Sequence, residues 1–278
     1  MMKFDLIEAT KEKILVVAHR GSAGGNIPCN TIAAYENALR QGADMIEVDL
    51  EMTADGHLVI FHPGMEPSHL NCKRHIPEMT LEEVRELRYV NYDRVPTQFG
   101  VEMFDDVLET FRGRCFINVD KFWGHPAEIS KAIRRHGMSD QMLVKSAPSD
   151  DVVRVLSELA PEIAYMPIIR GIDGTHEKLM ESNIRYIGCE ILFFDDSEPQ
   201  ASPDFIARLH RNGKLAWGNS IIYNCKKQIA AGHSDDTAIC GDPENGWGWL
   251  ADHGFDVIQT DWPILLINYL KSTGKYYK

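Results

Sequence analysis

The chain has 278 residues, of which 44% are hydrophobic and 25% are charged, as in an ordinary globular protein. Its formal net charge of -12 argues against nucleic acid as a partner and against attraction to anionic lipid, because both need a basic face. No apolar run approaches the roughly 18 residues of a membrane span, so we expect no stable membrane insertion.

The start of the chain and its cysteines bear on its compartment. Residues 1–14 are charged and lack the apolar core of a signal peptide. If Met1 is the natural start, we expect a cytoplasmic protein; a leader removed before Met1 would make it periplasmic or secreted. The six cysteines form no CxxC pair, which argues against a disulfide framework, and Cys115 and Cys189 lie in apolar runs typical of buried thiols.

Apolar runs rich in β-branched residues alternate with stretches of helical periodicity. The predicted strands are 14–19, 43–50, 115–122, 141–147, 163–169, 186–193, 214–220 and 255–261. The predicted helices are 31–42, 104–113, 126–137, 149–160, 175–182, 202–213, 244–254 and 263–274. This alternation predicts a parallel sheet covered by helices, and eight such units predict one (β/α)8 TIM barrel that takes up residues 1–278 as a single domain.

The segment after the second strand departs from this alternation. Asp55-Gly56 is a turn signal, so we expect the second strand to fold back as a short hairpin before a long loop at 63–79. Thr80 and Glu83 have the spacing of a capping box and predict one further helix.

Polar and ionisable side chains collect where the predicted strands end. In a TIM barrel these ends meet at one rim, and active sites lie there. The residues concerned are His19, Arg20, Glu47, Asp49, His62, Asp120, Lys121, Lys145, Glu190, Trp217, Asn219 and Asp261. We therefore expect them to face one mouth of the barrel.

Two carboxylates of the second strand suggest a metal site. Glu47 and Asp49 lie two residues apart, so both side chains point to the same face. A hard divalent cation, Mg²⁺ or Ca²⁺, would offset their repulsion, and Asp120 would supply a third oxygen ligand. The alternative is an ordinary charged pair with one member in solvent, but a place at a barrel mouth favours the metal.

The basic residues at the rim suggest chemistry on a phosphate. His19 and His62 are candidates for general base and general acid, since imidazole titrates near neutral pH, although either could be structural. Arg20 offers a fork for a phosphate or carboxylate, or a salt bridge to a neighbouring acid. Lys121 and Lys145 would add positive charge or serve the structure. A metal, paired histidines and cations together favour phosphoryl transfer or phosphodiester cleavage.

These residues resemble the signature of the glycerophosphodiester phosphodiesterases. The matching segments are AHRG at 18–21, PCNT at 28–31, GADMIEVDLEMTADGHLVIFH at 42–62, IPEMTLEEVREL at 76–87, VPTQFGVEMFDDVLE at 95–109, FINVDKF at 116–122 and GFDVIQTDWP at 254–263. The resemblance implies a TIM-type barrel that hydrolyses glycerophosphodiesters to glycerol 3-phosphate and an alcohol with one divalent cation.

The resemblance also implies roles for single residues. His19 and His62 would be the acid–base pair. Glu47 and Asp49 fall on metal ligands, and Asp120 is the best match to the third. The candidates for binding substrate or phosphate are Arg20, Asn30, Lys121, Lys145, Glu190 and Trp217.

The chain departs from the family pattern at three motifs. Cys29 and Pro63 stand where the family has Glu and Asp, and Phe122 stands where it has the phosphate-binding lysine. Lys121 lies one residue earlier, and neighbours on a strand point to opposite faces, so we do not expect it to approach the phosphate in the same way; Lys145 is an alternative. The loop after His62 is too short for the insertion domain of some members.

Two other functions stay open. A related barrel would cleave phospholipid headgroups as a phospholipase C or D does, and Trp123, Trp247 and Trp249 would then meet a membrane, unless they pack in the barrel. Alternatively, a barrel with these altered motifs would bind a phosphorylated ligand without cleaving it, although the retained histidines and carboxylates oppose this. The sequence predicts neither the alcohol nor the oligomeric state.

Overall fold

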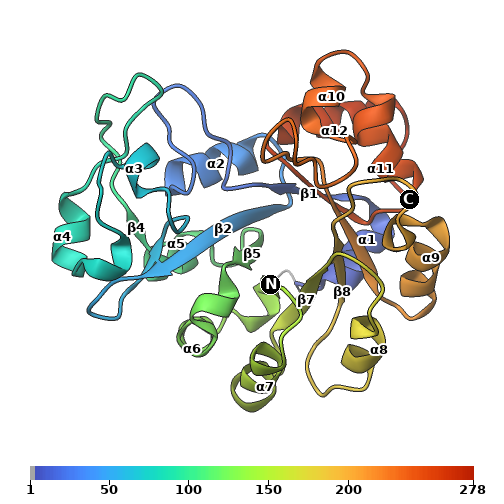
Figure 1. The fold of residues 1–278 in the computed structure, drawn as a ribbon, viewed down its shortest axis with the longest axis horizontal. Helices are drawn as coiled ribbons and strands as arrows, with labels where there is room; N and C mark the ends of the chain where they lie inside the picture. The colour runs from blue at the N-terminus through green and yellow to red at the C-terminus, as the bar shows by residue number, and fades with distance from the viewer. Residues whose placement is uncertain (1–3) are drawn as a thin grey trace.

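Eight parallel strands close into a barrel in the computed structural model, which describes residues 4–278 (Figure 1). The strands are β1 (Leu15–Ala18), β2 (Met45–Met52), β5 (Phe116–Asp120), β6 (Met142–Ser146), β7 (Ala164–Ile169), β8 (Gly188–Ile191), β9 (Leu215–Asn219) and β10 (Val257–Thr260). They pair in the order β1-β10-β9-β8-β7-β6-β5-β2, and the pairing of β1 with β2 closes the ring. The predicted TIM barrel and its strands are confirmed.

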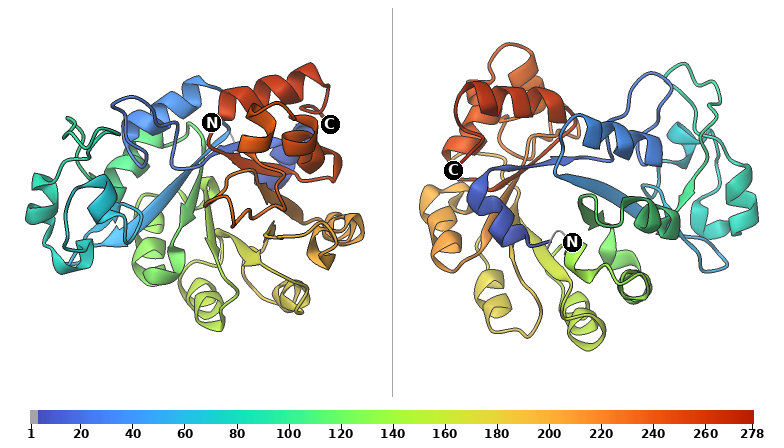
Figure 2. Two further views of the ribbon diagram at one scale, coloured as in Figure 1. Left: turned by 45° about the horizontal axis from the view of Figure 1, so that its top comes forward. Right: turned by 180° about the vertical axis from the view of Figure 1, so that it is seen from behind.

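Helices follow the strands and cover the outside of the barrel (Figure 2). Those that match predicted helices are α2 (Ile32–Arg40), α4 (Leu81–Glu86), α5 (Phe104–Phe111), α6 (Pro126–Arg135), α7 (Asp150–Leu159), α8 (Thr175–Met180), α9 (Pro203–Arg211) and α12 (Pro263–Ser272). The predicted helix 244–254 is instead a π-helical turn (Glu244–Gly248) followed by α11 (Trp249–Asp252), and α10 (Asp235–Ile239) precedes them. The capping box of Thr80 and Glu83 forms as expected.

The apolar residues of the strands serve two cores, because successive side chains point to opposite faces. Val16 and Val48 pack outward against the helices in one cluster. Val17 and Met45 point into the barrel and form part of a second cluster, to which Leu6 also belongs. Leu6 comes from α1 (Leu6–Glu12), a helix that the sequence did not predict, and α1 lies across the end of the barrel in the right-hand view of Figure 2.

The segment between β2 and β5 is more than a hairpin and a loop. The predicted hairpin forms, since β3 (Leu58–Ile60) pairs antiparallel with β2, and β4 (Glu102–Met103) adds a further antiparallel strand. The expected loop 63–79 contains α3 (Glu66–His69) and a 3-10 turn (Ile76–Glu78). Phe61, Leu70 and Tyr89 are among the residues of a separate hydrophobic cluster there. This lobe, at the left of Figure 1, thus has a small core of its own.

Two of the three tryptophans considered for a membrane surface pack within the protein. Trp247 is buried, and the Trp249 ring stacks on His233 with centroids 3.9 Å apart. Trp123 is 47% exposed. Within residues 4–278, none of the helices combines the length and apolar character needed to cross a membrane. The six cysteines, all in this range, are free thiols, and Cys115 and Cys189 are buried as expected.

Because Leu6 packs in the cluster inside the barrel, its truncation should destabilise the fold. Leu6 is 4% exposed, so Leu6→Ala should lower the free energy of unfolding by about 2–4 kcal/mol through the cavity that it leaves. Urea denaturation followed by circular dichroism would measure this change. Leu265→Ala is the control, because Leu265 is 40% exposed and its truncation should cost less than about 1 kcal/mol. An equal loss in both variants would contradict a role of Leu6 in the barrel core.

Candidate active site

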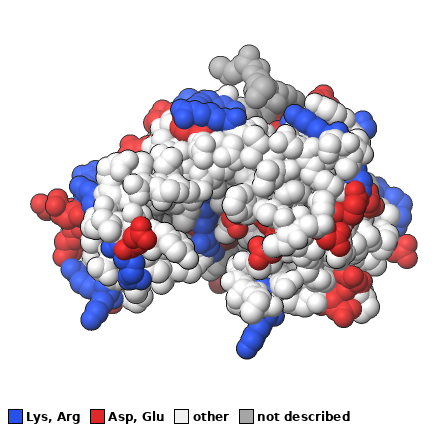
Figure 3. All heavy atoms as spheres, turned by 90° about the horizontal axis from the view of Figure 1, so that it is seen from above, with Lys and Arg blue, Asp and Glu red and all other residues white. Residues whose placement is uncertain are grey.

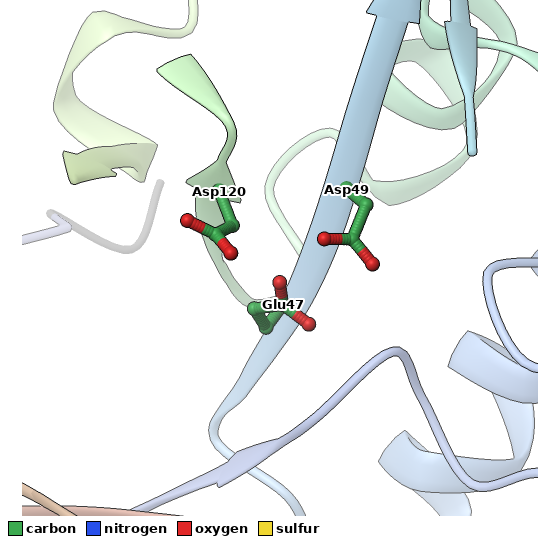
Figure 4. Close-up of side chains that lie close together, drawn as sticks. All are labelled: Glu47, Asp49 and Asp120. Atoms are coloured by element: carbon green, nitrogen blue, oxygen red, sulfur yellow. The ribbon is translucent and has the colours of Figure 1, made fainter. Parts of the chain in front are cut away.

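Three carboxylates converge between the middle of β2 and the carboxyl end of β5 (Figure 4). Glu47 and Asp49 lie on β2, and the register of the two strands sets Asp49 beside Asp120, the last residue of β5. One oxygen of each side chain lies within 4.8 Å of the others, and both β2 carboxylates are buried. The predicted acidic cluster is therefore present as a geometric group.

The electrostatics of this cluster are uneven. Burial and the neighbouring charge of Asp49 raise the pKa of Glu47 above its usual range. Burial would raise the pKa of Asp49 as well, but the charges of Arg20 and Lys121 outweigh it and hold that pKa below its usual range. The site thus favours a cation near Glu47, where negative charge is least compensated.

The oxygen atoms of the cluster suit a hard divalent cation. Oδ1 of Asp120 is buried and accepts no hydrogen bond from the part of the chain that the structure describes, and Oδ1 of Asp49 likewise lacks one, although the Lys121 ammonium lies 3.3 Å away. Buried acceptors without donors are costly, and Mg²⁺ and Ca²⁺ prefer carboxylate oxygens. Glu47, Asp49 and Asp120 therefore fit such an ion.

Arg20 and Asn30 brace the cluster from the loop between β1 and α2. The Arg20 backbone N–H donates to Glu47 Oε2 at 2.8 Å, and its Nε lies 2.8 Å from Asp49 Oδ2. Asn30 Nδ2 donates to the same Asp49 oxygen at 2.8 Å, and its Oδ1 accepts from the Tyr35 hydroxyl at 2.9 Å. Arg20 therefore forms the salt bridge left open by the sequence while its side chain still lines the cavity.

Two carboxylates, those of Asp261 and of Asp235 in α10, position His19. Its Nδ1 donates to Asp261 Oδ1 at 2.8 Å, and the Asp261 backbone N–H donates to Asp235 Oδ2 at 2.8 Å. The other oxygen of Asp235 accepts from Ser220, Trp247 and Thr260, each at 2.7 Å. Burial opposes a charged His19, but the bond to Asp261 and the charge of Glu47 outweigh it and raise the pKa of His19.

Little in the sequence predicts this pair of carboxylates. The end of a predicted strand places Asp261 at the rim without indicating its role, and no local pattern singles out Asp235. Asp235 lies in the short helix α10, far along the chain from β10, so only the folded structure brings it under Asp261.

His62 faces the same cavity as His19 but has the opposite electrostatic setting. Its Nδ1 lies 2.9 Å from the Pro63 carbonyl oxygen, which can only accept, so Nδ1 carries the hydrogen. Burial lowers the pKa of His62, and the positive charges of Arg20 and Lys121 add to this effect. The two histidines are thus biased toward different protonation states.

Lys121 lies inside the site, although strand alternation would point it away from Asp120. It follows the end of β5 in a left-handed conformation, with φ of 61°, so its side chain turns back toward the cluster. Its ammonium contacts Asp120 and lies 3.3 Å from Asp49 Oδ1. The expectation that Lys121 and Asp120 face opposite ways is wrong, because the strand ends between them.

Lys145 lies near the end of β6, the strand that pairs with β5. Its Nζ lies 2.6 Å from Glu190 Oε2 and 3.9 Å from the centroid of the Trp217 ring. Glu190 also accepts from Asn219 Nδ2 at 2.7 Å. Trp217 is fully buried beneath Lys145 and is not among the residues that line the cavity. Trp217 therefore contacts Lys145 and the barrel core.

Two hollows meet at His19 and Arg20. We call the first the inner cavity; it has a volume of about 530 Å³, and its wall includes His62, Lys121 and Lys145. The second, the outer groove, has a volume of about 610 Å³ and follows the loops after β1 and β10. In the space-filling view of Figure 3, the surface is hollowed between two lobes, and Lys and Arg atoms lie in the hollow.

These features define a class of protein: a TIM barrel with oxygen ligands for a cation and basic groups for an anion at the carboxyl ends of its strands. The family model described as "Glycerophosphoryl diester phosphodiesterase family" matches residues 19–263. The chain belongs to the glycerophosphoryl diester phosphodiesterase family.

Curated relatives share parts of the sequence. The chain is 30% identical over 160 residues to a glycerophosphodiester phosphodiesterase of Caldanaerobacter subterraneus, a match that covers 54% of this chain and 65% of the relative. It is 43% identical over 74 residues to a probable glycerophosphodiester phosphodiesterase of Mycobacterium tuberculosis, which covers 27% of either chain. The matched region thus spans less than two thirds of these relatives.

Solved structures share the fold over nearly the whole chain. A glycerophosphoryl diester phosphodiesterase from Parabacteroides distasonis has a TM-score of 0.79 and 19% identity, over 98% of this chain and 95% of its own. A phosphodiesterase from Oleispira antarctica, solved in complex with the product sn-glycerol-3-phosphate, has a TM-score of 0.70 and 20% identity, over 93% and 97%.

The hydrogen bonds of Asp235 predict an effect on His19. In Asp235→Asn, an NH2 group would replace one carboxylate oxygen and would face donors that this oxygen now accepts from. We therefore expect Asp261 to shift away from His19 and the pKa of His19 to fall. An NMR titration of the imidazole would measure this pKa. Asp236→Asn is the matched control, because Asp236 is the exposed neighbour of Asp235. An unchanged His19 pKa in Asp235→Asn would contradict the positioning role.

Proposed function

We propose that the protein hydrolyses glycerophosphodiesters to glycerol 3-phosphate and an alcohol. The observation that carries the proposal is one shared site: the three carboxylates within 4.8 Å of one another lie beside Arg20, and His19 and His62 line the same cavity. Membership of the family and the product-bound Oleispira antarctica relative support the same reaction.

In this proposal Glu47, Asp49 and Asp120 hold one divalent cation, Mg²⁺ or Ca²⁺. When bound, the cation would stabilise negative charge that develops on the phosphoryl oxygens. The Arg20 guanidinium and the Lys121 ammonium bind the same group from either side of Asp49. Asn30 positions Asp49 instead of binding phosphate, since both ends of its buried amide are engaged within the protein.

The histidines divide the proton transfers between them. His62, biased toward the neutral form, presents Nε2 as the general base that takes a proton from the attacking water, whose oxygen becomes the new oxygen on phosphorus. His19, biased toward the cation by Asp261, donates a proton to the leaving oxygen. Opposite shifts of two titratable groups in one site are typical of an acid and a base that act together.

The glycerol half of the substrate is assigned to the inner cavity. Its base is formed by Lys145, Glu190, Asn219 and Gln259, which offer both donors and acceptors to vicinal hydroxyls. Trp217 supports this floor from below through the Lys145 ammonium. Substrate recognition by Trp217 is thus indirect in this proposal.

The test is hydrolysis of glycerophosphocholine, glycerophosphoethanolamine, glycerophosphoglycerol and glycerophosphoinositol with Mg²⁺ and Ca²⁺ in parallel. We expect a chelator to abolish product formation and added cation to restore it. Glu47→Gln should lower kcat/KM by about 100-fold or more, because it removes a ligand of the charge-stabilising ion. Glu51→Gln, on the same strand but paired with His125, should keep activity near that of the parent protein.

Three outcomes would contradict parts of the proposal. Activity that survives chelation would exclude the metal assignment. Binding of a diester without product after long incubation would indicate a barrel that only binds its ligand. Cleavage of phospholipid vesicles in preference to these soluble diesters would favour a headgroup phosphodiesterase.

The histidine assignments predict a bell-shaped dependence of kcat/KM on pH. His62 must be neutral and its pKa is lowered, so activity should rise at a pH below the ordinary histidine value. His19 must be charged and its pKa is raised, so activity should fall only above that value. Asp261→Asn should move the alkaline limb down by about one pH unit or more. A shift of the acidic limb instead would reverse the two roles.

A further inference from the structure

The outer groove begins at the proposed reaction site and continues along an apolar wall. His19 and Arg20 line both this groove and the inner cavity, so the proposed phosphate position lies where the two hollows join. A phosphodiester has two substituents, and one anchored at this junction extends one substituent into each hollow. The chemistry of the two walls should therefore reflect the two halves of the substrate.

The wall of the outer groove exposes large apolar side chains. Trp262, Ile264 and Leu265 line it and are 49%, 42% and 40% exposed. They lie at the start of α12, whose other face is buried in the core through Leu266 and Leu270. Adjoining exposed apolar residues beside a polar site are typical of a surface that binds an apolar ligand.

The loop on the other side of the groove adds no fixed negative charge. Cys29, which stands where the family motif has Glu, lines the groove together with Ala23. Burial raises the pKa of the Cys29 thiol to about 11, with Arg20 opposing the shift, so this side chain is neutral at pH 7. The charged groups that line the groove, Arg20 and Asp261, lie with His19 at its junction with the reaction site, and Ser22, Gln41 and His69 are further polar residues of its wall.

The wall of the inner cavity is apolar in part, with Ile168, Leu192, Ile221, Ile222 and Ile229 among its residues, but its base is polar. Lys145, Glu190, Asn219 and Gln259 form a buried polar floor there, which suits the hydroxyls of glycerol. An alkyl chain would have to displace hydrogen bonds at that floor, whereas in the outer groove it would cover apolar surface. The polar base assigns the glycerol half of the diester to the inner cavity, and the other half then lies along the exposed apolar side chains of the groove.

We propose that the outer groove binds the alcohol half of the substrate and that this alcohol carries an alkyl or acyl chain. The proposal rests on the proposed function, because the groove is defined relative to the phosphate. It narrows the substrate class from glycerophosphodiesters in general to those with an apolar leaving alcohol.

The test uses glycerol 3-phosphate esters of ethanol, butanol, hexanol and octanol, each below its critical micelle concentration. Full burial of one methylene corresponds to about a fourfold gain in binding. The groove is open to solvent on one side, so we expect kcat/KM to rise about twofold per added methylene, mainly through KM.

Ile264→Asp and Leu265→Asp test whether the groove causes this dependence. Aspartate is well tolerated in the first turn of a helix, so both variants should fold. Whatever their rate on the ethyl ester, both variants should lose the gain with chain length, because the chain would no longer cover apolar surface. Ile172→Asp is the matched control, since Ile172 is 46% exposed and lines neither hollow, and it should keep the gain.

The outcomes separate this proposal from the proposed function. If none of the esters is cleaved, the proposed function fails. If the ethyl ester is cleaved and rates do not rise with chain length, or rise equally in Ile264→Asp and Leu265→Asp, the groove proposal is wrong. Loss of the gain in Tyr223→Asp, which alters the wall of the inner cavity, would place the chain there and also overturn it.

Discussion

The register between β2 and β5 is the constraint on which the site depends. It sets Asp49 beside Asp120, with Glu47 one pleat earlier, and so places three carboxylates in a largely buried space. Such a group is unfavourable unless positive charge surrounds it. Arg20 and Lys121 supply part of that charge, and a divalent cation would supply the rest.

Unusual backbone geometry brings the compensating groups into place. Arg20, Asn30 and Lys121 all have positive φ, at 56°, 56° and 61°. Non-glycine residues seldom adopt this conformation, and it is often found at functional sites. Gly21 completes the turn, because a Cβ there would lie 2.7 Å from the Ala34 backbone carbon. The loop after β1 is therefore strained, and this conformation directs the side chains of Arg20 and Asn30 toward Asp49.

The sequence predicted the features that repeat along the chain. Each strand has an apolar run and a polar end, which is enough to predict the barrel and its rim. The i, i+2 spacing of Glu47 and Asp49 was enough to place both on one face. The helix α1 escaped prediction because its seven residues are too few to show a helical period. The lobe after His62 escaped it because Leu70, Ile76 and Met79 lie in short, irregular segments.

Other features depend on geometry that no local pattern encodes. Lys121 turns inward because of a single φ angle, and Asp235 reaches Asp261 only through the packing of α10 against β10. Trp217 shares a strand face with Asn219 but lies one layer deeper, so the rim predicted from the sequence included a residue of the core. Gly246 and Gly248 interrupt the predicted helix 244–254, and a Cβ at Gly246 would meet Ala238 at 2.7 Å.

The apolar cluster inside the barrel, which we call the plug and which includes Leu6 and Met45, also affects the chemistry above it. Along β2, Met45 belongs to that plug, and Glu47 follows only two residues later, a distance of about 7 Å along the strand. The carboxylates of β2 therefore lie directly above a layer of hydrocarbon side chains. Charges above such a layer are screened by solvent from one direction only, so their fields act more strongly on any anion that approaches from the open mouth.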